Sequence, residues 1–185
     1  MFQNLEYHQL RFERSFKALF PNCIIPDLRK LLAETPASNV LQKCRILYDG
    51  LTIDVSFHTY IPKPLSTLKL VIDDTIDYCF KYENRSSILK NVSNKGSCDD
   101  ILIVKNGLVT DTSYGNILFE KEGVWFTPDK PLLPGTQRQC ILDKKVASER
   151  TIRVDQLRDF ERFMVINSMM PFDEQRAQTM KNIYP

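Results

Sequence analysis

The fold class follows from the stretch ILIVKNGLVTDTSYGNILFEKEGVWFTPD, which occupies residues 101–129. Short apolar runs rich in β-branched and aromatic residues fill this stretch, as is typical of β-strands. The pairs Asn106-Gly107 and Glu122-Gly123 separate the runs, and glycine accepts the backbone angles of a tight reversal. The stretch therefore predicts two adjoining antiparallel hairpins.

Two helices, a hairpin and a further strand are predicted on the N-terminal side. Apolar side chains recur at steps of three and four over residues 4–20, which predicts an amphipathic helix that a proline ends. A shorter helix is expected over residues 26–32. Residues 44–60 alternate between apolar and polar side chains on both sides of Asp49-Gly50, which predicts a hairpin. Residues 66–73 predict the further strand.

The C-terminal side is expected to mix short helices with strands. The polar tail after Pro171 is expected to be peripheral. The remaining elements are predicted as a helix at 85–92, a helix at 136–148, a strand at 151–154, a helical turn at 154–158 and a buried strand at 161–170.

The order of these elements indicates the class and the domains. Antiparallel hairpins dominate and no regular βαβ array is present, so the class is α+β. The stretch from Pro62 to Asp77 is rich in proline and aspartate, and we expect the seam between two lobes there. We therefore divide the chain into a small α/β lobe, residues 1–75, and a larger lobe, residues 76–185.

Composition excludes several classes of protein. The 25 basic and 23 acidic residues give a net charge of +2, and they are scattered, so neither nucleic acid nor a membrane surface is expected as a partner. The five cysteines are odd in number and widely spaced, which favours reduced thiols and a cytoplasmic protein. The two histidines, His8 and His58, are too few and too far apart for a histidine-based metal site, and we expect no metal.

Four segments, taken together, resemble the class IV aminotransferase family, which includes branched-chain and D-amino-acid aminotransferases and 4-amino-4-deoxychorismate lyases. They occur in the family's order, and the K-x-x-N-R form of the second is most similar to the lyases. The segments are YHQLRFERS, KYENR, VTDTSYGNILF with the following VWFTPDKPLLPGTQR, and FMVINSMMP. The resemblance implies a two-lobed fold, with pyridoxal 5'-phosphate (PLP) in the cleft between the small lobe and the larger, PLP-binding lobe, and a homodimer.

Lys81, in KYENR, is implied by the resemblance to be the catalytic lysine that forms a Schiff base with PLP. Such an amine needs a depressed pKa, which desolvation or a nearby positive charge supplies. Lys81 follows Tyr78, Cys79 and Phe80, so we expect it at the end of an apolar strand and half-buried. A surface lysine at a strand end is the alternative.

Asp111 and Asn116 are implied to lie behind the cofactor ring. The resemblance places the Asp111 carboxylate against the pyridine nitrogen, where an anion keeps that nitrogen protonated. The family usually has glutamate at this position, and aspartate is one methylene shorter. A turn-capping role is the alternative for Asp111. Asn116 is expected to order the turn rather than to react.

The cofactor phosphate is implied to bind at a helix start and at two flanking groups. Gly135, Thr136 and Gln137 open the predicted helix, whose first backbone N–H groups form an anion site. Ser168 would add a hydroxyl or an amide. Arg11, in the H-x-x-R pattern of the first helix, would add a guanidinium, although a solvated helix face is the alternative.

The resemblance leaves two reactions of a small-molecule amino substrate open. One is the elimination of pyruvate from 4-amino-4-deoxychorismate, which gives 4-aminobenzoate for folate synthesis; the KYENR and INSMM spellings favour it. The other is amino transfer between an amino acid and a 2-oxo acid. A cofactor-free binding or structural relative is a third possibility, since aspartate replaces the usual glutamate.

The start of the chain is short for the family. Members carry an N-terminal strand and hairpin before the H-x-x-R helix, whereas His8 here is preceded by only seven residues. We expect Phe2 to finish a strand and Asn4 to cap the helix. We also expect a truncated small lobe, with the natural start upstream of Met1.

Overall fold

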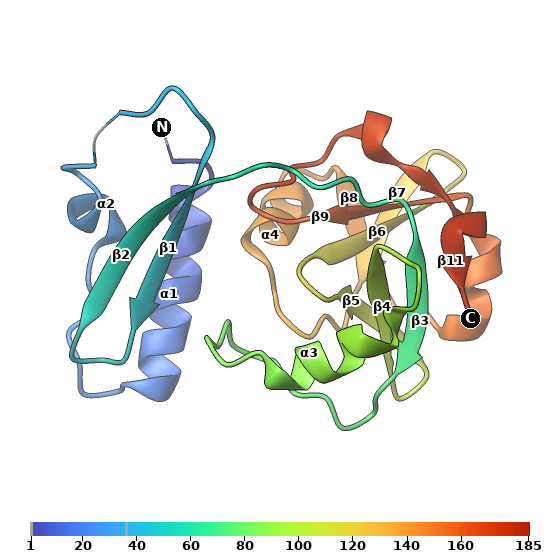
Figure 1. Cartoon of the computed structure of the whole chain (residues 1–185), viewed down its shortest axis with the longest axis horizontal. Helices are drawn as coiled ribbons and strands as arrows, with labels where there is room; N and C mark the ends of the chain where they lie inside the picture. Colours follow the sequence, from blue (N-terminus) through green and yellow to red (C-terminus); the bar gives the residue numbers. More distant parts are fainter. Residues whose placement is uncertain (1, 36) are drawn as a thin grey trace. The chain divides into compact units, whose positions relative to one another are not determined.

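The computed structural model describes residues 2–35 and 37–185, and the chain divides into two compact units between Lys63 and Pro64 (Figure 1). The division falls inside the predicted seam, but twelve residues before the boundary that we placed after residue 75. The reason is the strand β3 (Leu68–Ile72), which pairs with β4 (Asp100–Lys105) and so belongs to the second unit. Each unit is described by itself.

The first unit packs one helix on a two-stranded hairpin (Figure 1). The apolar stripe of α1 buries Phe12 and Phe16, and Tyr48 of the hairpin stacks on Phe16 with ring centroids 5.1 Å apart. The hairpin strands pair antiparallel through the predicted turn. The elements are α1 (Leu5–Leu19), α2 (Leu28–Leu31), β1 (Gln42–Tyr48) and β2 (Ile53–Thr59).

The start of the first unit differs in two respects from the prediction. Asn4 occupies the position before α1 but has a left-handed φ of 54° and no side-chain cap bond to the helix, so the predicted cap is wrong. Phe2 lies outside any strand, because the only strands of the described first unit are the two of the hairpin. Asp27 does cap α2, since its side chain accepts from Arg29 N at 2.8 Å.

The second unit is built around one mixed sheet of nine strands. Its main path runs in the order β10-β9-β6-β5-β4-β3-β11, and β7 and β8 branch from β6. The further strands are β5 (Leu108–Thr112), β6 (Asn116–Lys121), β7 (Val124–Pro128), β8 (Ala147–Arg150), β9 (Arg162–Ile166), β10 (Gln178–Thr179) and β11 (Ile183–Tyr184). The helices are α3 (Ser86–Val92), α4 (Thr136–Asp143) and the 3-10 turns η1 (Ser93–Lys95), η2 (Val154–Asp159), η3 (Glu174–Arg176) and η4 (Met180–Asn182).

The two predicted hairpins are confirmed at the centre of this sheet. Asn106 and Gly107 have φ values of 53° and 75°, and Glu122 and Gly123 have 52° and 76°. Two consecutive residues with positive φ give the turn whose twist matches the flanking strands. Fully buried apolar side chains of β4, β6 and β9 form the core, among them Leu102, Ile117, Phe119 and Phe163. The α+β class is thereby confirmed.

Three features of the C-terminal half differ from the prediction. The helix predicted to extend to Ser148 ends at Asp143, because Lys145 adopts a positive φ of 56° and Ala147 begins a strand parallel to β7. Residues 151–154 contribute an isolated bridge at Arg153 in place of the predicted strand. The tail is not merely peripheral, since β10 and β11 extend both ends of the sheet path.

Two classes of feature are not found in the described residues. None of their helices combines the length and the apolar character needed to cross a bilayer. Their histidine, cysteine and acidic side chains form no group of three placed to hold a metal ion.

Candidate functional site

Asp111, next to last in β5, is a buried acid that accepts two hydrogen bonds. It is 5% exposed. Its Oδ1 accepts a hydrogen bond from Asn116 Nδ2 at 2.7 Å, and its Oδ2 accepts from the backbone N–H of Leu133 at 2.9 Å. Since Asn116 opens β6, the turn between β5 and β6 brings both predicted residues together. The carboxylate retains lone pairs for one further donor.

Burial dominates the electrostatics of this acid. Desolvation raises the pKa of Asp111 to about 6, although the bonds from Leu133 and Asn116 and the charge of Arg138 oppose the rise. Burial therefore makes the ionised carboxylate less stable than it would be in water, although the group is still mostly ionised at pH 7. A cation placed beside the carboxylate, such as a protonated pyridine nitrogen, would offset that cost.

The raised pKa predicts a pH dependence of stability in the cofactor-free protein. The folded carboxyl keeps its proton up to about pH 6, while the unfolded chain releases it near its ordinary value of 3.8. The folded state thus binds more protons between these values, so the free energy of unfolding falls as pH rises from about 4 to 6, by up to about 3 kcal/mol. Urea titrations of wild type and Asp111→Asn over this range measure the difference. Parallel curves for the two proteins would contradict the prediction.

Asn116 connects Asp111 to the start of α4. Its Nδ2 also donates to the Leu133 carbonyl oxygen at 2.9 Å, and its Oδ1 lies 2.0 Å from where a Cβ on Gly135 would stand. Gly135 has an ordinary φ of −74°, so space, and not backbone angle, requires glycine here. The close approach sets the helix start directly against the asparagine.

Gly135→Ala is therefore expected to damage the site. An added methyl group would force Asn116 away from Asp111, at a cost of about 1–3 kcal/mol in stability. We expect weaker PLP binding than in wild type, measured by absorbance titration, together with a lower thermal midpoint. Gly123→Ala is the control for lost stability alone: its φ of 76° strains an alanine and should lower the thermal midpoint, but its added Cβ meets nothing within 4 Å and should leave PLP binding unchanged. An unchanged titration for Gly135→Ala would reject the packing argument.

The first turn of α4 offers an anion site. The first backbone N–H groups of a helix have no acceptor within it and carry partial positive charge. Thr136 Oγ1 and Ser168 Oγ lie 2.8 Å apart, so the structure brings these two predicted phosphate ligands together. Gln137 is 6% exposed in the same turn. Arg138 turns elsewhere, since its Nη2 donates to Pro128 O and to Glu149 Oε1.

Lys81 lies in an irregular segment between β3 and α3 and is exposed. The expectation of a half-buried lysine at a strand end is therefore wrong, because β3 already ends at Ile72. The segment is nevertheless anchored to the site. Tyr78 is buried in one cluster with Leu133, the residue whose amide binds Asp111. Arg85 Nη2 donates to the Ser113 carbonyl oxygen at 2.6 Å.

Arg11 belongs to the first unit and lies on α1, partly buried. Its Nη2 lies 3.4 Å from Nδ1 of His8, one turn earlier on the helix. Its contact with a phosphate stays a prediction.

Sequence reasoning missed three groups of the site, namely the Asp100 carboxylate and the backbone amides of Ser113 and Leu133. Asp100 is 2% exposed and accepts from Ser113 N at 3.1 Å, and the Leu133 amide binds Asp111. Backbone donors carry no residue-type signal. Asp100 did carry a sequence signal, because it stands directly before the apolar run of β4, and an acid buried there needs a hydrogen-bond partner.

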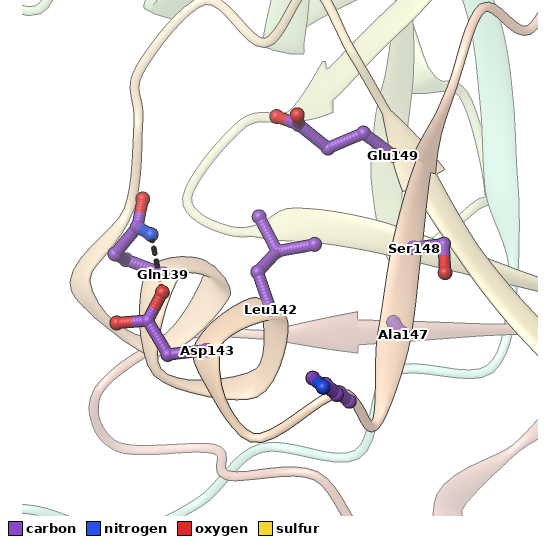
Figure 2. Close-up of a pocket in the computed structure, with 7 residues that line it drawn as sticks. Gln139, Leu142, Asp143, Ala147, Ser148 and Glu149 are labelled. Atoms are coloured by element: carbon purple, nitrogen blue, oxygen red, sulfur yellow. Dashed lines mark hydrogen bonds between the residues drawn. The ribbon is translucent and has the colours of Figure 1, made fainter.

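A shallow depression of about 460 Å³ lies apart from these residues, between α4 and β8 (Figure 2). Gln139, Leu142 and Glu149 contribute to its lining. Gln139 Nε2 donates to Asp143 Oδ1 at 2.8 Å along its rim (Figure 2). None of the predicted site residues lines it, so we do not assign it to the candidate site.

Comparison with known proteins identifies the family of the chain. Residues 81–172 match the family described as amino-transferase class IV. An uncharacterized protein of Haemophilus influenzae is 39% identical over 170 residues, which are 90% of each chain. The crystal structure of a Haemophilus somnus protein, provisionally named a 4-amino-4-deoxychorismate lyase, superposes with a TM-score of 0.88 at 35% identity. The superposition covers 92% of this chain and 91% of the Haemophilus somnus chain.

A more distant structure shows the fold alone. A hypothetical aminotransferase from Mycobacterium tuberculosis, solved in a PLP-bound form, has a TM-score of 0.70 at 15% identity. The match covers 96% of this chain and 75% of the other. From the family match and the Haemophilus somnus relative, the chain belongs to the class IV aminotransferase family, a family of PLP-dependent enzymes.

Proposed function

We propose that this protein binds PLP and catalyses the release of pyruvate and 4-aminobenzoate from 4-amino-4-deoxychorismate. The cofactor part of this proposal rests on the cluster of Asp111, Asn116 and the start of α4. In this cluster Asn116 contacts a buried acid on one side and the helix start, with its N–H groups, on the other. Two observations favour the lyase reaction, namely the K-x-x-N-R form of residues 81–85 and the likeness to the provisionally named lyase of Haemophilus somnus.

The chemistry of these groups fits PLP. Asp111 would hold the protonated ring nitrogen, since it is buried, accepts two hydrogen bonds and has a raised pKa. The first amides of α4, including that of Gln137, with the Thr136 and Ser168 hydroxyls, would hold the phosphate. Arg11 would add a guanidinium to the phosphate. Bound PLP supplies an electron sink for negative charge that forms at the substrate Cα.

Lys81 is the proposed catalytic residue. Its amine would attach to the cofactor aldehyde and, once the substrate amine has displaced it, accept the proton of the substrate Cα. Elimination and amino transfer share these steps, so the residues of the described cluster serve either outcome.

The test mixes the pure protein with PLP and follows 4-aminobenzoate by its fluorescence, beside a panel of amino donors with 2-oxo acids. Formation of 4-aminobenzoate with negligible amino transfer is the expected result. Amino transfer alone would replace the proposal with a transaminase. A preparation that stays colourless with added PLP would support a cofactor-free relative.

We further propose that the enzyme acts as a homodimer on small amino substrates, as the family resemblance implies. Light scattering during size-exclusion chromatography measures the mass against the 21.6 kDa of one chain. A mass of one chain at micromolar concentration would reject the dimer.

A reducing, cytoplasmic location is also proposed. All five cysteines are free thiols in the structure, and two of them, Cys98 and Cys140, are buried. Free thiols in this number are typical of a compartment that keeps them reduced.

A further inference from the structure

A charged hydrogen bond ties the Lys81 segment to the turn beside Asp111. Arg85 stands directly before α3, and its Nη2 donates to the Ser113 carbonyl oxygen at 2.6 Å. Ser113 is two residues beyond Asp111. The bond thus joins the segment of the proposed catalytic lysine to the strand end of the proposed ring-nitrogen partner.

Ser113 is held from its other side by an acid. Its backbone N–H donates to Asp100 Oδ2 at 3.1 Å, and Asp100 is 2% exposed. Ser113 therefore donates to an anion and accepts from a cation, and both bonds are of the stronger, charge-assisted kind. The two bonds together hold the Ser113 backbone in place beside Asp111.

Lys81 lies in a segment outside any helix or strand, so the contacts of that segment fix its place. Tyr78 OH donates to the Tyr82 carbonyl oxygen at 2.8 Å and closes the chain on both sides of Lys81, which sets the local shape of the segment. That bond is internal to the segment, so it does not set the segment's place relative to Asp111. The Arg85 bond does, because Ser113 belongs to the Asp111 turn.

We infer that Arg85 is a positioning residue that holds Lys81 at a set distance from Asp111 by way of Ser113. The inference rests on the proposed function, in which both residues meet one cofactor. A cofactor fixed by Asp111 presents its aldehyde at one place, and a lysine about 1 Å out of position reacts up to about 100-fold more slowly.

The test compares Arg85→Met, which keeps the stem without a donor, with Arg85→Lys, which keeps one charged donor. PLP is added, samples are reduced with borohydride at timed intervals, and mass spectrometry measures the adduct on Lys81. We expect attachment to slow about 10- to 100-fold in Arg85→Met and less in Arg85→Lys. Arg158→Met, which changes an exposed arginine of η2, should match wild type.

A second readout separates positioning from disorder. In cofactor-free protein, acetylation of Lys81 by acetic anhydride, relative to the exposed Lys144, requires no alignment with Asp111. We expect this ratio to stay within about twofold of wild type in Arg85→Met while PLP attachment slows. A change of the same size in both reactions would overturn the inference in favour of a general effect on the segment.

The remaining outcomes are distinct. Wild-type protein that forms no adduct on Lys81 would refute the proposed function itself. Arg85→Met that attaches PLP at the wild-type rate would overturn the positioning role alone. If Arg85→Met does not fold, Arg85→Lys decides: slower attachment with a native near-ultraviolet spectrum supports the role, and wild-type attachment or failure to fold overturns it.

Discussion

Lys81→Ala is expected to lose covalent attachment of PLP completely and to lower turnover by at least about 1,000-fold. A positioned general base alone contributes about 100- to 10,000-fold, and the lysine also forms the covalent link. No other lysine of the chain stands in a K-x-x-N-R setting. The absorbance of bound cofactor and borohydride reduction with peptide mass spectrometry measure the loss of attachment, and the 4-aminobenzoate assay measures the loss of turnover.

Lys144→Ala is the matched control, because Lys144 is exposed at the end of α4 and stands outside the candidate site. It should retain full occupancy and turnover. A borohydride-stable adduct at full occupancy in Lys81→Ala would move the catalytic role to another amine.

The hairpins of the second unit could be predicted because their information is local. Asn106 and Gly107 form a turn whose backbone angles few other pairs accept, so the turn sets the β4–β5 register next to it, before a bulge shifts the pairing at Leu102. The same reasoning failed for Lys81, because Tyr78 is buried although it belongs to an irregular segment and not to a strand, and Cys79 is exposed. Periodicity does not distinguish burial in such a segment from burial in a strand.

The polar part of the site was predicted as a set of residue types but not as a network. Leu133 and Gly135 lie far in sequence from Asp111 and Asn116, and the contacts between them depend on the Leu133 amide and carbonyl, which any residue except proline would supply. Asp100 was missed for a similar reason, since its partner is a backbone N–H. Sequence patterns identify side-chain chemistry, whereas tertiary structure determines which backbone groups complete it.

The shorter acid at position 111 has a structural explanation. Leu133 N and Asn116 Nδ2 approach the two carboxylate oxygens at 2.9 Å and 2.7 Å, so the surrounding segments already reach an aspartate. A carboxylate one methylene longer would have to displace either donor. The substitution of aspartate for the family's usual glutamate is therefore compatible with a working site.

Asp111→Asn is expected to lower turnover by about 100- to 1,000-fold while the protein stays folded. The neutral amide cannot hold a pyridinium charge, and one well-placed charge is worth about that factor. The amide NH₂ would also face either Asn116 Nδ2 or Leu133 N, both of which are donors. PLP affinity should fall as well, which absorbance titration measures beside the assay. Turnover near that of wild type would remove Asp111 from the mechanism.

Asp111→Glu keeps the charge and tests the fit. Because both carboxylate oxygens are already bound in a site with 5% of the residue exposed, the added methylene overpacks it at a cost of about 1–3 kcal/mol. We expect glutamate to bind PLP more weakly than aspartate, with turnover between those of wild type and Asp111→Asn, since the charge survives in a displaced position. Equal or faster turnover by Asp111→Glu would mean that the Leu133 segment moves to accommodate the longer acid. The argument that the site is fitted to aspartate would then be rejected.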